Sequence, residues 1–167
     1  PPNLNNPRIF QSLGRIDAKS LESCDQLLLI LPEKPAASLF RQLPEGSKMH
    51  RVLRATADDS TPALRTRLSN KKVTLVVGGI VKKESSTFEQ LTLGRKLVAA
   101  LADEKAGSVG ICVLGFDDGA QAIIVNNILA AALAAAFVLP SYKSKQPPAT
   151  IKSLRIVGVQ ARVDTRR

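Results

Sequence analysis

The chain of 167 residues has no tryptophan, only 4% aromatic residues and a single histidine, His50. Its two cysteines, Cys24 and Cys112, are too few for a disulfide framework, and one histidine excludes a histidine-rich zinc site. The sequence also lacks a Gly-x-Ser-x-Gly elbow and the common phosphate-binding motifs. We therefore assign no catalytic residue to this chain.

What the chain does contain is aliphatic. Hydrophobic residues make up 44% of it, so the core must be built from leucine, valine, isoleucine and alanine. That composition suits helices packed closely on a sheet. The N-terminus has neither a basic nor an apolar stretch of the kind that opens a secretory signal, and reduced cysteines favour the cytoplasm.

The net charge of +10 is unevenly distributed. Residues 48–83 carry nine basic and two acidic side chains, and residues 140–167 carry seven and one. Such an excess can bind nucleic acid through its phosphates, without reading its sequence. The other interpretation is a solvated surface, which is the usual role of charge runs.

Residues 26–31, Gln-Leu-Leu-Leu-Ile-Leu, are a continuous apolar run that predicts a strand buried on both faces. A short helix is predicted over 36–43, where proline residues flank a helical pattern. Residues 50–55 alternate between basic and apolar side chains, which predicts a strand with one exposed face. Residues 61–68 begin with Thr-Pro, which is typical of the first positions of a helix.

The second half alternates strands and helices. A strand over 73–77 is predicted to end at Gly78-Gly79, and a strand over 109–114 to precede a helix that Asp117 or Asp118 caps and that ends at Leu139. A final strand is predicted over 151–159. The alternation predicts an α/β three-layer sandwich with a mixed, mostly parallel sheet flanked by helices. We expect one domain over residues 1–160 and the start of a linker over 161–167.

Ser86 and Glu89 have the spacing of a capping box, which predicts a helix that ends at about Ala106. Gly94 lies near its apolar face, which predicts a close approach of a neighbouring backbone. That face is formed by Phe88, Leu91, Val98 and Leu101.

The predicted helix over 119–139 contains no charged residue and is long enough to span a membrane. Alanine, however, contributes little to the free energy of transfer from water into a membrane, and Asn126-Asn127 would lie inside the bilayer. We predict instead a helix buried against the sheet, and no membrane partner.

Two further features suggest ligands only weakly. Gly78 and Gly79 follow a predicted strand, as a loop that binds an anion would, although ordinary glycine turns explain them as well. Asp58-Asp59 and Asp117-Asp118 are more typical of caps and turns than of a metal site. We therefore expect no metal or cofactor in this chain.

Several segments together resemble the N-terminal domain of the leucyl aminopeptidase (M17) family: Phe88-Glu89-Gln90-Leu91, Gly94-Arg95-Lys96, Ser108-Val109-Gly110-Ile111, Ser141-Tyr142-Lys143-Ser144-Lys145 and the strand from Ile151. The resemblance implies a fold similar to macro domains. It also implies a cytosolic, hexameric aminopeptidase whose two divalent ions, zinc or manganese, bind to a separate C-terminal catalytic domain. The ligand motif of that domain, Asn-Thr-Asp-Ala-Glu-Gly-Arg, does not occur here.

On this basis the chain is predicted to be a non-catalytic assembly and regulatory domain. Tyr142, Lys143 and Lys145 then form either a polar corner at a domain or subunit interface or a solvated turn. Two alternatives stay open. One is a free-standing macro-like module that binds a nucleotide or ADP-ribose through the loops after Val77 and Leu114, and the other is a basic DNA-binding domain.

Overall fold

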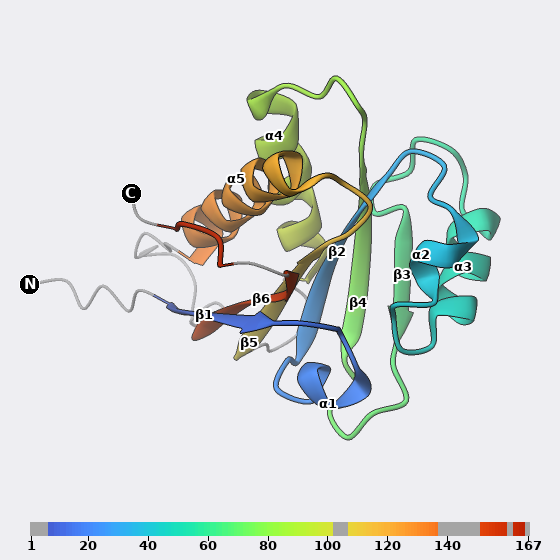
Figure 1. Cartoon of the computed structure of the whole chain (residues 1–167), viewed down its shortest axis with the longest axis horizontal. Coiled ribbons are helices and arrows are strands. Elements are labelled where there is room, and N and C mark those ends of the chain that lie inside the picture. Colours follow the sequence, from blue (N-terminus) through green and yellow to red (C-terminus); the bar gives the residue numbers. More distant parts are fainter. Residues whose placement is uncertain (1–6, 102–106, 137–150, 160–161, 166–167) are drawn as a thin grey trace, which may run out of the picture.

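The computed structural model describes residues 7–101, 107–136, 151–159 and 162–165. They form a six-stranded sheet in the order β1-β6-β5-β2-β4-β3 (Figure 1). Neighbouring strands are parallel except for β3 and β4, which are antiparallel. The predicted α/β three-layer sandwich is therefore confirmed. The strands are β1 (Arg8–Leu13), β2 (Gln26–Pro32), β3 (Leu64–Arg67), β4 (Leu75–Val81), β5 (Ser108–Val113) and β6 (Ser153–Val159).

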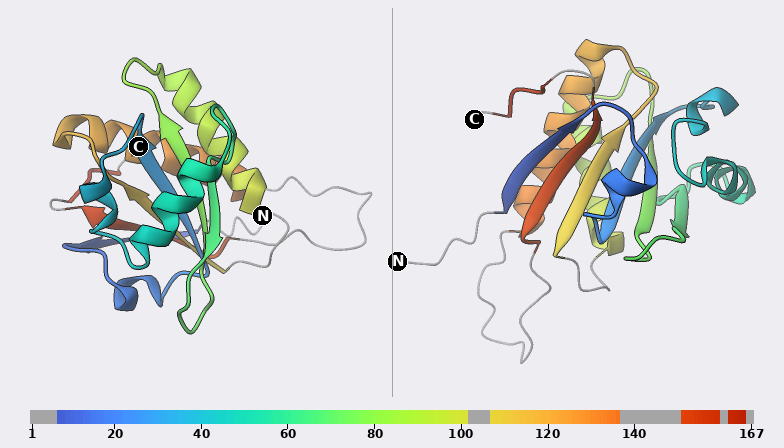
Figure 2. Two further views of the ribbon diagram at one scale, coloured as in Figure 1. Left: turned by 90° about the vertical axis from the view of Figure 1, so that its right-hand side faces the viewer. Right: turned by 60° about the horizontal axis from the view of Figure 1, so that its bottom comes forward.

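Helices cover both faces of the sheet (Figures 1 and 2). The long helices α4 (Thr87–Leu101) and α5 (Asp118–Ala136) lie on one face, and the short helices α1 (Ala18–Leu21), α2 (Ala37–Phe40) and α3 (Gly46–Ala55) lie on the other. Strand β2 lies between them: Leu28 packs with the α4–α5 layer and Leu29 with the opposite layer. Its burial on both faces confirms the prediction from its apolar run.

The predicted strand over 50–55 is wrong, because these residues belong to helix α3. Met49 is buried, Val52 and Leu53 are half-buried, and Arg51 and Arg54 are exposed. The spacing of the apolar residues is that of one helix face. The predicted segment began at residue 50, so it left out Met49 and was too short to show this spacing. The change moves the basic side chains from a sheet face to the outer surface of a helix.

The predicted helix over 61–68 is also wrong, because residues 64–67 form the edge strand β3. Leu64 and Leu68 are both buried. A separation of four residues fits one helical turn as well as two strand repeats, so the spacing alone did not decide between them. Pairing with β4 settles the strand conformation.

The predicted end of a strand at Gly78-Gly79 is wrong as well, because β4 continues to Val81. A Cβ at Gly78 would contact Leu64 and a Cβ at Gly79 would contact Leu97 and Leu93, so both glycines make room for side chains on either face. Helix α2 is shorter than the predicted 36–43. Strand β1 and helix α1 were not predicted.

Helix α4 begins with the predicted capping box. The backbone N–H of Ser86 donates to Glu89 Oε2 (2.6 Å), and the N–H of Glu89 donates to Ser86 Oγ (3.1 Å). The predicted close approach at Gly94 is confirmed, since a Cβ there would lie 2.7 Å from Cβ of Ala131 in α5. Phe88 is 71% exposed, so its predicted place on the buried face is wrong. The predicted end near Ala106 lies outside the described residues.

Helix α5 begins where the sequence predicted, because Asp117 Oδ1 accepts a hydrogen bond from the N–H of Ala120 (2.8 Å). It packs on α4 and β5, as expected for a helix buried against the sheet. By length and composition alone it could also cross a membrane, and a third of its most apolar window is buried here. Its predicted end at Leu139 lies outside the described residues.

Asp25 joins the amino-terminal ends of three strands. Its Oδ2 accepts hydrogen bonds from the N–H groups of Gly107 and Ser108 (both 3.0 Å), and Lys72 Nζ lies 3.3 Å from its Oδ1. Its own carbonyl accepts from the N–H of Leu75 in β4. Partial burial opposes ionisation of this carboxyl, but the hydrogen bonds from Ser108 and Gly107 and the nearby Lys72 outweigh it and lower its pKa.

We expect Asp25→Asn to destabilise the protein at pH 7 by about 1–2 kcal/mol. This lies toward the lower end of the range for hydrogen bonds to a charged group, because a third of the side chain is exposed to solvent. A pKa lowered by folding means that the carboxylate stabilises the fold above its ordinary pKa, and that this stabilisation is lost as the pH falls through the folded pKa. Urea unfolding at several pH values should therefore show the deficit of the variant shrinking below about pH 4. Asp58→Asn, at an exposed loop position, is the control, and equal effects at both positions would contradict the proposed role of Asp25.

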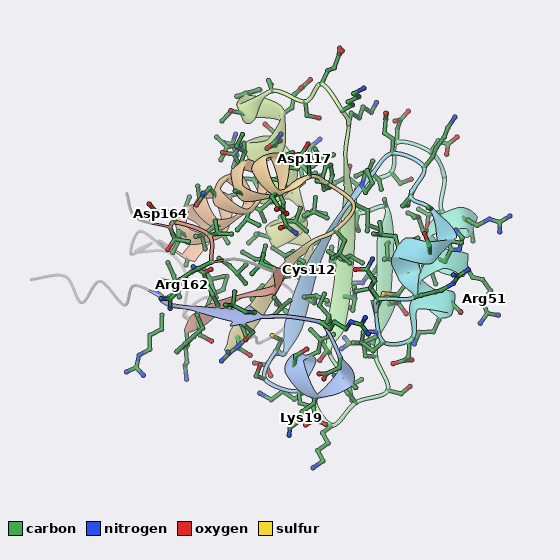
Figure 3. The ribbon with its side chains drawn as sticks, in the orientation of Figure 1. Lys19, Arg51, Cys112, Asp117, Arg162 and Asp164 are labelled. Atoms are coloured by element: carbon green, nitrogen blue, oxygen red, sulfur yellow. The ribbon has the colours of Figure 1, made fainter. Side chains whose placement is uncertain are left out.

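The segment after β6 is anchored to β1. Gln11 Nε2 donates to the carbonyl of Val163 (2.7 Å), and Gln11 Oε1 accepts from the N–H of Val163 (2.9 Å). Val163 is buried in the α4–α5 layer, and Asn126 Nδ2 of α5 donates to the carbonyl of Asp164 (3.3 Å). Figure 3 shows Arg162 and Asp164 on this side of the molecule. Val163 and Asp164 thus contact β1 and α5, within the segment that the sequence suggested as the start of a linker.

Candidate functional site

A cleft of about 1110 Å³ lies where the parallel strands β2 and β4 end. Its walls come from the loop after β2, from α3, from the loop over 56–63 and from Leu93 of α4. Leu53, Ala63 and Ile80 provide apolar surface within it. The carboxyl edge of parallel strands is the usual place for a ligand in α/β sheets. This cleft is therefore the candidate site of the described part of the chain.

The charges along the cleft are mixed. Its basic residues are Lys34, Arg54 and Lys82, and its acidic residues are Glu33, Asp58 and Asp59. Lys82 Nζ lies 3.6 Å from Asp59 Oδ1, and both side chains are well exposed. An exposed pair of this kind adds little to stability. The cleft thus shows no excess of one charge that would select an anion or a cation.

His50, the only histidine of the chain, also lines the cleft. Its ring stacks on Phe40 of α2, with the two ring centres 4.6 Å apart and an angle of 14° between the planes. The stack ties α3 to α2, which explains the residue without a ligand.

Several side chains of the basic run over 48–83 contact other parts of the fold. Lys48 pairs with Glu45 at 2.9 Å, Arg65 donates to the carbonyl of Ala100 at the end of α4 (2.9 Å), and Lys72 pairs with Asp25. Arg51, by contrast, points outward from α3 (Figure 3). Much of the local charge therefore has structural partners. Nucleic-acid binding by these residues stays a prediction.

The two predicted ligand loops differ from what the sequence suggested. Gly78 and Gly79 are buried residues inside β4, next to Leu29 and Ile30 of β2, so they do not form a loop after a strand. In the loop after β5, Asp117 is an N-cap rather than part of a phosphate site. Binding of a nucleotide or ADP-ribose therefore stays a prediction. The cleft beside α3 is lined by Ile80 and Lys82, at the end of the strand that contains Val77, but by no residue of the loop after Leu114.

Both cysteines are buried and unpaired. Burial raises the pKa of each thiol, so neither is an activated nucleophile. Figure 3 shows Cys112 inside the molecule. Among the residues that the structure describes, no group of three or more His, Cys, Asp or Glu side chains is placed to hold a metal ion. Tyr142, Lys143 and Lys145 lie outside the described residues, so their role stays a prediction.

No protein-family model and no curated protein matches this chain. Among solved structures, a mutant of tomato leucine aminopeptidase has the same fold, with a TM-score of 0.58 and 16% sequence identity. The match covers 92% of this chain and 33% of that chain, so the present chain spans about a third of the length of the aminopeptidase. At this identity the likeness shows the fold alone.

The cleft could not be predicted from the sequence, because its residues come from segments between Glu33 and Leu93 that are far apart along the chain. One signal was available. The loops after β2 and β4 must lie side by side if the two strands are adjacent and parallel. Strand order, however, cannot be read from the pattern of apolar residues.

Proposed function

We propose that this chain is the non-catalytic N-terminal assembly and regulatory domain of a cytosolic, leucyl aminopeptidase-like enzyme. The observation that carries the proposal is the shared fold, which takes in nearly all of this chain but only a third of the tomato leucine aminopeptidase. A chain three times as long leaves room for a separate domain that performs peptide hydrolysis. In that enzyme, a hexamer, two divalent ions, zinc or manganese, would be held by the separate domain and not by the residues described here.

The chemistry of the described side chains supports a structural role. His50 is stacked on Phe40, and the thiols of Cys24 and Cys112 are buried. The carboxylates with lowered pKa values, Asp25 and Glu45, are held by hydrogen bonds to neighbouring backbone and lysine groups. Each of these groups helps to connect elements of the fold.

The proposal predicts that the native gene product is much heavier than 17.9 kDa, the mass of this chain. An antibody raised against the 167-residue chain should detect that product in cell extract and should precipitate an activity that releases leucine from leucine p-nitroanilide. A chelator should abolish the activity, and zinc or manganese should restore it. The purified 167-residue chain and a precipitate made with non-immune antibody serve as controls, and neither should cleave the substrate. A native product near 17.9 kDa, or hydrolysis by the purified chain itself, would overturn the proposal.

A further inference from the structure

The two edges of the sheet are protected very differently. Strand β3 is only four residues long, carries the exposed Arg65 and Arg67, and has α3 packed beside it. Short length, positive charge and a covering element are the common ways to prevent an edge from pairing with another strand. By these criteria the β3 edge is closed to further strands.

Strand β1 (Arg8–Leu13), at the opposite edge, is less protected. Its one charged residue, Arg8, stands at its first position, and the segment around Val163 is hydrogen-bonded to it only through the side chain of Gln11 among the described contacts. The strand is six residues long, pairs only with β6 among the described strands, and has no lysine or proline. The irregularity in its pairing comes from an extra residue in β6, at Gly158, so the outer side of β1 remains regular. Figure 2 shows β1 as the outermost strand, beside β6.

Three of the six large hydrophobic residues that the described structure exposes belong to β1: Ile9 (38%), Phe10 (40%) and Leu13 (59%). Phe10 is partly covered, since the guanidinium of Arg155 lies 4.9 Å from the centre of its ring. Ile9 is covered to a similar extent, and Leu13 is the most exposed of the three. Ile9 and Leu13 share the face of the strand on which Gln11 reaches Val163, because alternate residues of a strand point the same way.

The backbone direction fixes which groups are available for pairing. The N–H of Arg8 donates to the carbonyl of Lys152, just before β6, and the N–H of Gly14 donates to that of Val159 in β6, so the even-numbered residues of β1 face that strand. The N–H and C=O groups of Ile9, Gln11 and Leu13 therefore point away from the sheet.

We propose that the outer edge of β1 pairs antiparallel with β1 of a second copy of this chain, about a two-fold axis at Gln11. In this register Gln11 faces Gln11 of the other copy and Ile9 faces Leu13, so each outward residue exchanges both of its backbone hydrogen bonds. The two exposed aliphatic side chains cover each other on one face. A two-fold axis at Phe10 would instead place Leu13 opposite Pro7, which has no N–H to donate.

Size and charge set the expected strength of this contact. A strand of six residues is about 20 Å long, so pairing of the edges alone gives an interface below the ~1,200 Å² of standard stable complexes. Each copy also carries a net charge of +10, which opposes association at low ionic strength. We therefore expect a weak dimer that added salt strengthens. The inference goes beyond the proposed function and does not depend on it.

The test is sedimentation equilibrium of the complete 167-residue chain over a wide range of concentrations, at low and at high sodium chloride. Ile9→Lys and Leu13→Glu should each weaken the dimer about tenfold, because each places an unpaired charge opposite an aliphatic side chain twice in the interface. The double variant Ile9→Lys/Leu13→Glu should restore it, because the new charges then face each other across the axis. Ile123→Lys, at a similarly exposed apolar position on α5, should leave the dimer unchanged.

Three results would overturn the inference. The first is a chain that stays monomeric at all concentrations and salt levels. The second is a dimer that the two β1 variants leave intact or that the double variant fails to restore. The third is a dimer that dissociates on addition of salt, which would indicate bridging by a bound polyanion instead of strand pairing. Circular dichroism melts of the variants show in each case whether the fold is kept, which we expect because all three positions are exposed.

Discussion

Gly46→Ala is expected to destabilise the protein by about 3 kcal/mol or more, at or beyond the upper end of the usual range for overpacking. Gly46 is the first residue of α3, and a Cβ placed there would collide with the backbone carbonyl of Phe40 in α2. Backbone atoms cannot rotate away as a side chain can, so α2 and α3 must separate. Separation also removes the stack of His50 on Phe40 and one wall of the cleft. Urea unfolding followed by circular dichroism measures the loss.

Gly119→Ala is the matched control for this change. Gly119 lies in the first turn of α5, is exposed, and has only Asp117 Oδ1 near the position of a new Cβ, at 3.5 Å. Alanine favours a helix over glycine by about 1 kcal/mol, so this variant should be neutral or slightly more stable. If both variants lost similar stability, the cost would come from removing glycine and not from the contact between α2 and α3.

The sequence predicted the elements whose signals are local and strong. Strand β2 is a continuous run of aliphatic residues, and α4 and α5 begin with caps that the structure reproduces at Ser86 and Asp117. In each case the residues that decide the conformation are neighbours in the chain. Such patterns can be recognised from the sequence alone, because no contact with a distant part of the chain is needed to form them.

The errors fall where two periodicities fit the same residues. Leu64 and Leu68 satisfy a helical turn and a strand equally, and pairing of β3 with β4 decides the outcome. The basic and apolar residues of α3 alternate over a short window, although burial of Met49 and exposure of Arg51 follow a helix. Tertiary context overrides local preference at these positions.

The edge strand β1 could not be predicted for a related reason. Its side chains are neither continuously apolar nor cleanly alternating, since Ile9 and Phe10 are adjacent and both are partly exposed. A strand with one partner and little burial leaves a weak pattern.

Gly94→Leu is expected to cost about 3 kcal/mol or more of stability, because the glycine sits at a close contact between α4 and α5. A Cβ at this position would lie 2.7 Å from Cβ of Ala131 and 3.3 Å from Cδ1 of Ile128. Both neighbours are buried, so the leucine side chain has no space unless the helices move apart. Separation would expose apolar surface along a layer that also packs on β4 and β5. Thermal and urea unfolding should both show the loss.

A double-mutant cycle separates this contact from the general effect of placing a side chain on the helix. Gly94→Ala adds a methyl group where Ala131 already has one, and Ala131→Gly removes that group, so the double variant moves the methyl from one helix to the other. The helix propensities of the two changes cancel, which leaves the contact as the difference. We expect the double variant to be more stable than the sum of the single changes predicts, by about 1–2 kcal/mol. Additive effects would mean that α4 and α5 can adjust their separation freely, and that the approach at Gly94 does not fix the distance between them.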